Sequence, residues 1–72
     1  MQSKIPGEIK IIGDLGIWEI ALMAGGEIRI SAQAYSLNEG QYVFVALAEG
    51  QPRYEVELAR IPKEMVASIT GG

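Results

Sequence analysis

The chain contains no cysteine and no histidine. Disulfides are therefore excluded, and so is a zinc site built from those two residue types. The same absences remove the commonest general base and the thiol nucleophile of enzymes. The remaining carboxylates, lysines and tyrosines form no convergent set of acid, base and nucleophile along the chain. We expect a protein without catalytic activity that uses no cofactor and no metal.

Basic residues are few, with six lysines and arginines against nine acidic residues and a net charge of −3. They are scattered, whereas nucleic acids and anionic membranes require a dense basic patch. No apolar run approaches the length of about 20 residues that spans a bilayer, and the first residues lack the apolar core of a signal peptide. We expect no nucleic-acid or membrane partner and a cytoplasmic location.

The 72 residues are enough for one domain, which we assign to 1–72. In a chain of this size the burial of apolar surface only narrowly exceeds the conformational entropy lost on folding. Small proteins usually add disulfides, a metal or a partner subunit. Since disulfides and a zinc site built from Cys or His are excluded, oligomerisation is the remaining common source of stability.

Glycine-rich turns divide the chain at regular intervals into runs of about 6 to 11 residues, which is the spacing of an all-β protein. We predict a small antiparallel β-sandwich or barrel of five to six strands. The expected strands cover residues 8–13, 17–24, 27–37, 41–48 and 53–61. Residues 62–69 allow either a short C-terminal helix, because proline is favoured in a first turn, or a sixth strand.

The alternation of apolar and polar residues assigns faces to these strands. The side chains expected to point inward are Trp18, Ile20 and Leu22, then Ile28, Ile30, Ala32 and Ala34, and finally Tyr54, Val56 and Leu58. Tyr35 is expected to point outward.

The run 41–48 differs because it is apolar on both faces of a strand. A strand with one wet face should alternate, so this one needs cover from both sides. We expect Val43, Val45 and Leu47 to form an interface between copies of the chain, which would associate through this face or by strand addition at sheet edges. The predicted function is a self-associating structural or protein-interaction module.

Two other features of the sequence are candidate sites. Glu55 and Glu57 share a strand face, but without an Asp- or Asn-rich loop a solvated face is favoured over a cation site. Loops containing Gly25, Gly26, Glu49 and Gly50 provide an alternative function, a small-molecule or peptide binding module with its ligand between subunits.

A third function follows from the terminal Gly71-Gly72, because ubiquitin-like and sulfur-carrier proteins end in a flexible Gly-Gly tail. Those folds insert a helix after the first hairpin, whereas this chain has the strand pattern EIRISAQAYS there.

From Ile9 to Gly72 the order of strands and turns resembles the tryptophan RNA-binding attenuation protein family. The resemblance is carried by the hairpin Asp14-Leu15-Gly16-Ile17 and the strand that follows it to Gly25, by the turn Leu37-Asn38-Glu39-Gly40, and by the last strand, 64–71. It implies a ring of subunits. The RNA-contacting Lys and Arg side chains of that family are replaced here by Ser36, Glu55 and Glu57, so the resemblance implies the ring without the RNA binding.

Overall fold

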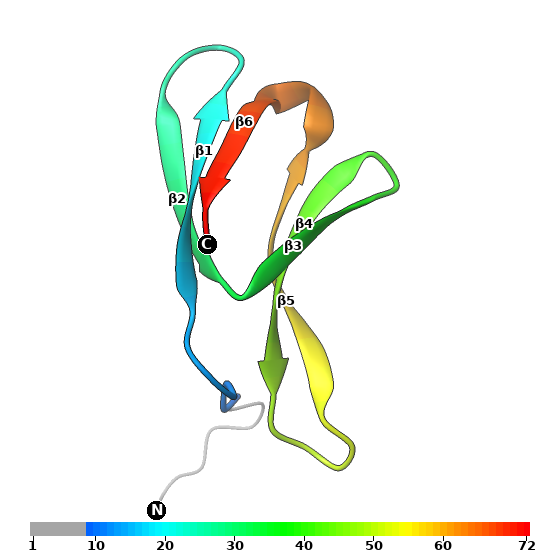
Figure 1. The fold of residues 1–72 in the computed structure, drawn as a ribbon. Coiled ribbons are helices and arrows are strands. Elements are labelled where there is room, and N and C mark those ends of the chain that lie inside the picture. The colour runs from blue at the N-terminus through cyan, green and yellow to red at the C-terminus, as the bar shows by residue number, and fades with distance from the viewer. Residues whose placement is uncertain (1–8) are drawn as a thin grey trace, which may run out of the picture.

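The structure, a computed structural model, describes residues 9–72 as two three-stranded antiparallel sheets (Figure 1). The elements in chain order are β1 (Gly16–Leu22), β2 (Glu27–Ala32), β3 (Ala34–Asn38), β4 (Gln41–Ala48), β5 (Tyr54–Pro62), the 3₁₀ turn η1 (Lys63–Met65) and β6 (Val66–Gly71). One sheet has the order β2-β1-β6 and the other β3-β4-β5, and we name them the β1 sheet and the β4 sheet after their central strands. The expected all-β fold of five to six strands is confirmed.

Of the two alternatives for residues 62–69, the sixth strand is correct, and in place of a short helix there is a turn of three residues. Pro62 ends β5 and is followed by the single turn η1, after which the chain becomes the sixth strand and pairs with β1. In contrast, the strand expected at 8–13 is reduced to one bridge between Ile11 and Ala48 within the described residues, and residue 8 lies outside them.

The strand expected at 27–37 is interrupted at Gln33, and its two halves belong to different sheets. The interruption shifts the alternation of faces, so Ala32 is fully buried while Ala34 is exposed. Tyr35 is paired with Phe44, and its ring centroid lies 5.4 Å from that of Phe44 and 5.0 Å from that of Trp18. The predictions that Ala34 points inward and Tyr35 outward are therefore wrong, because neither allowed for a break in the strand.

A second shift occurs in β5. Phe44 is paired with Ala59 and Val45 with Glu57, which leaves Leu58 as an extra residue in a β-bulge. Leu58 is 40% exposed, so its predicted inward position is wrong. In a regular strand Val56 and Ala59, three residues apart, would point to opposite faces. The bulge places both on the face that packs against the core, where each is half-buried.

The core lies between the two sheets, with Ile20 on β1 and Phe44 on β4 fully buried at its centre. Ala32 and Ile61 complete the buried cluster, and the indole N–H of Trp18 donates a hydrogen bond to the Ala32 carbonyl at 3.1 Å. Complete burial of a side chain such as Ile20 contributes about 1.5–3 kcal/mol. The inward positions of Trp18, Ile20 and Leu22 are confirmed, since all three belong to this cluster or pack against it.

Three glycines allow β6 to close against β1. A β-carbon at Gly16 would meet the backbone of Gly72, and one at Gly72 would meet the ring of Trp18. Gly71 has a φ of 106°, and a β-carbon there would meet the carbonyl oxygen of Ile17. Glycine is needed for space at all three positions, and at Gly71 and Gly72 also for the positive φ of the backbone.

Gly71→Ala should lower the free energy of unfolding by about 2–4 kcal/mol, because left-handed strain and a steric clash add. Gly25→Ala is the matched control, since Gly25 has a φ of 100° but no atom within 4 Å of the added carbon. It should cost only the strain, about 1–2 kcal/mol. Urea unfolding at one fixed protein concentration measures both, and equal losses for the two variants would show that the close packing of β6 is wrong.

Candidate interaction surface

The outer face of the β4 sheet carries Val43, Val45 and Leu47, the three residues predicted to form an interface. Val43 is only 6% exposed and the other two are half-buried. Their cross-strand partners on β5 are charged: Val43 is opposite Arg60, Val45 opposite Glu57 and Leu47 opposite Glu55. The chain itself thus covers part of this face, and the apolar area left for a partner is smaller than the sequence indicated.

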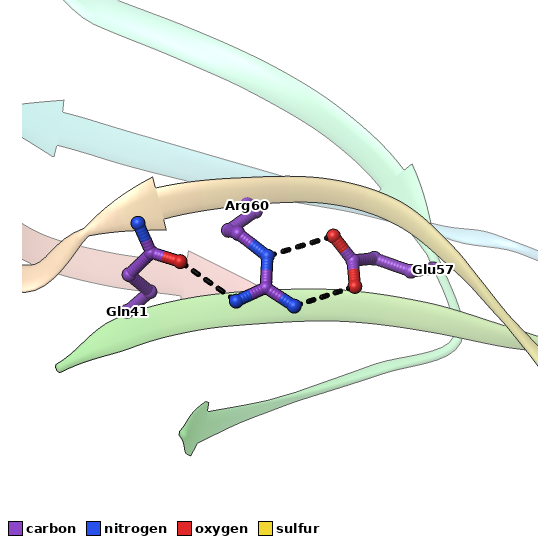
Figure 2. A network of polar contacts seen from close by, with 3 residues as sticks. All are labelled: Gln41, Glu57 and Arg60. Atoms are coloured by element: carbon purple, nitrogen blue, oxygen red, sulfur yellow. Dashed lines mark hydrogen bonds and ion pairs between the residues drawn. The ribbon is translucent and has the colours of Figure 1, made fainter. Parts of the chain in front are cut away.

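Arg60, opposite Val43 on this face, forms a network of hydrogen bonds with Glu57 and Gln41 (Figure 2). Its Nε and Nη2 atoms donate to the two carboxylate oxygens of Glu57 at 2.8 and 2.7 Å, and its Nη1 donates to Oε1 of Gln41 at 2.7 Å. The hydrogen bonds from Arg60 lower the pKa of Glu57, and the carboxylate raises the pKa of Arg60. Both groups are open to solvent, so their attraction is screened.

This network also bears on the cation site considered for Glu55 and Glu57. Both carboxylate oxygens of Glu57 accept hydrogen bonds from Arg60, which leaves Glu55 without a second free carboxylate beside it. Residues 9–72 contain no group of three or more acidic side chains that could hold a metal ion. The Glu57–Arg60 pair has no signal in the sequence, because residues three apart point to opposite faces of a regular strand.

Gln33 is a second important side chain that sequence reasoning missed. Its Nε2 donates to the Ile12 carbonyl at 2.5 Å, and its Oε1 accepts from the Leu47 N–H at 2.8 Å. Its backbone N–H donates to the Val45 carbonyl at 2.9 Å. Gln33 therefore joins three parts of the chain: the segment before β1, the break between β2 and β3, and the last residues of β4.

The loops predicted to hold a ligand lie at opposite ends of the molecule. Gly25 and Gly26 form the turn between β1 and β2, whereas Glu49 and Gly50 belong to the loop between β4 and β5 (Figure 1). Beside Glu49, Gly50 and Gln51 the surface has a shallow depression that is open to solvent rather than enclosed. A site combining both loops would need two copies of the chain.

The edges of the sheets differ in charge and regularity. β3 is an edge strand of five residues, all exposed and none charged, with Tyr35 37% and Leu37 54% exposed. β5, the opposite edge of the same sheet, carries charged side chains and the bulge at Leu58. Unpaired strands without charge, proline or bulge are the edges most open to strand addition.

The terminal glycines are packed rather than free in this structure. Gly71 is the last residue of β6, and the Gly72 N–H donates to the Ile17 carbonyl at 3.1 Å. A carrier function would require this segment to leave Trp18 and enter the site of a modifying enzyme. The packing argues against that alternative.

No family model matches the chain, and no curated protein or solved structure matches it at a significant level. Within residues 9–72 no helix is long and apolar enough to cross a membrane.

Replacing Gln33 by leucine should lower the free energy of unfolding by about 1–3 kcal/mol, because the Ile12 carbonyl and the Leu47 N–H lose their partner. The control is Gln51→Leu in the exposed β4–β5 loop, which should change the free energy by about 0.5 kcal/mol or less. Urea unfolding compares the two variants. A Gln33→Leu protein as stable as the control would contradict the joining role of Gln33.

Proposed function

We propose that the protein is a non-catalytic module that associates with copies of itself through strand edges. The observation that carries the proposal is β3, whose five residues are all exposed, uncharged and free of bulges. Its outward N–H and C=O groups can pair with another strand as they would within a sheet.

Apolar side chains surround this edge. β2 continues into β3 through Gln33 alone, and the chain passes there from one sheet to the other (Figure 1). Ile28 on β2 is 39% exposed, and Tyr35 and Leu37 on β3 are exposed as well. Covering such side chains contributes roughly 25 cal/mol per Å² of apolar area, a useful gain for a domain of this size.

The charge distribution also favours β3. Two copies that each carry a net charge of −3 repel one another. Contact along β3 brings no charged side chain of that strand into opposition, whereas contact along β5 would approach Glu55 and Glu57. Edge addition is thus better supported than stacking of the face around Val45, which is half-covered by its own chain.

The size of the assembly depends on which edges meet. Pairing of β3 with β3 of a second copy closes a two-fold dimer, whereas pairing of β3 with a different edge generates a ring or an open chain. The resemblance to the tryptophan RNA-binding attenuation protein family supports the ring.

Ligand binding between subunits is the second candidate function, although the depression beside Glu49 and Gly50 is open to solvent and does not by itself enclose a ligand. A change in Trp18 fluorescence on screening amino acids and nucleotides, with unchanged molecular mass, would favour it. A silent screen would favour the structural role.

Light scattering after gel filtration should give a mass of at least twice the 7.8 kDa of one chain. Leu37→Lys should raise the dissociation constant at least about tenfold, because a lysine at the edge guards against strand addition. Met23→Lys is the control: it makes the same change of charge at a 67% exposed residue in the β1–β2 turn, and should keep the mass of the wild type.

Val45→Glu separates the two routes of association. If Val45→Glu dissociates the assembly while Leu37→Lys does not, the copies meet through the outer face of the β4 sheet rather than through the β3 edge. Circular dichroism confirms that each variant is folded. A wild-type protein that remains a monomer at about 100 µM would refute the proposed self-association.

A further inference from the structure

The hydrogen bonds between Glu57 and Arg60 depend on the bulge in β5. In a regular strand, side chains at positions i and i+3 point to opposite faces and cannot meet. Here the extra residue Leu58 restores a common face, so Glu57 lies opposite Val45 and Arg60 opposite Val43 on the outer side of the sheet. The ion pair therefore exists only while the bulge is present.

The bulge is the point at which the apolar pattern changes its face. Ile61 and Ala59 face the core on one side of Leu58, and Val56 does so on the other. Sliding the extra residue along the strand would turn one of these side chains outward and would separate Arg60 from Glu57. Burial and the ion pair thus favour the same register.

We propose that Glu57 and Arg60 form a clasp, sensitive to acid and salt, that holds the bulge of β5 at Leu58 and keeps this edge strand irregular. All three nitrogens of the Arg60 guanidinium take part in the clasp. Nε and Nη2 donate two parallel hydrogen bonds to the Glu57 carboxylate, and Nη1 donates to Gln41 on β4. Bidentate pairs of this kind add geometric specificity to their attraction. The clasp belongs to a single chain and does not depend on self-association.

The direction of the pH effect follows from the carboxylate. The pKa of Glu57 is lowered in the folded chain by its hydrogen bonds to Arg60. The stabilisation is therefore fully present above the pKa of an unfolded glutamate, about 4.3, and is lost as the pH falls through the lower folded value.

Few other charges act on the clasp. Glu55 shares its face two residues along β5, and Glu39 acts on Arg60 from the β3–β4 turn. Val43 and Val45, the residues of β4 opposite the pair, do not titrate. Acid therefore acts on the clasp chiefly through Glu57 itself.

The test is amide hydrogen exchange by NMR on the full chain, with protection of residues 57–61 divided by that of β1 to remove any global loss of stability. At neutral pH, Glu57→Gln should lower this ratio roughly two- to fivefold, the range expected for one exposed ion pair. Glu55→Gln removes the same charge two residues away and should leave the ratio unchanged. Exchanging the two charges in Glu57→Arg/Arg60→Glu should restore most of the lost protection.

The wild type provides a second measurement that needs no substitution. Its ratio should fall when the pH is lowered from 6 to 3 or when about 1 M NaCl is added, whereas that of Glu57→Gln should respond much less. Equal effects of Glu57→Gln and Glu55→Gln, or a wild-type ratio that is insensitive to both acid and salt, would overturn the clasp.

Discussion

The contacts of Gln33 set the geometry on which the rest of the molecule depends. Its backbone N–H reaches Val45, and its side chain satisfies both the Ile12 carbonyl and the Leu47 N–H. An amide side chain can donate and accept at once, which a hydrocarbon of the same length cannot do. By ending β2 and starting β3 on the other sheet, Gln33 turns one run of alternating residues into the two layers of a sandwich. The buried cluster of Ile20 and Phe44 forms between those layers.

The sandwich is small for the amount of apolar side chain that the chain contains. Only Ile20 and Phe44 are both large and fully buried in the described part of the chain. Exposed apolar residues are common on protein surfaces and need no explanation one by one. Here, however, Tyr35 and Leu37 are exposed on β3, an edge strand whose outward backbone groups pair with no other strand among the described residues. Apolar area and free hydrogen-bonding groups occur together, and a strand of a second copy would satisfy both.

Sequence reasoning was most successful where a strand keeps one alternation from end to end. The inward side of β1 was predicted because Trp18, Ile20 and Leu22 share a face. Sequence reasoning fails at Gln33 and at Leu58. At each of these positions one irregular residue reverses which of the following side chains point inward. Neither position carries a glycine or proline as a local signal, since a bulge or a break is defined by the partner strand. The Glu57–Arg60 pair was missed for the same reason: its two residues meet only after the shift.

These two irregularities also make the two edges of the β4 sheet unequal. The break at Gln33 leaves β3 short, regular and uncharged, while the bulge at Leu58 leaves β5 bent and lined with charged side chains. If both edges were regular, copies could add on either side and assembly would have no preferred direction. Under the proposed self-association, a bulge held on one side would limit strand addition to the other edge of this sheet. The pair formed by Glu57 and Arg60 therefore contributes to specificity more than to stability, since an exposed ion pair adds little to the latter.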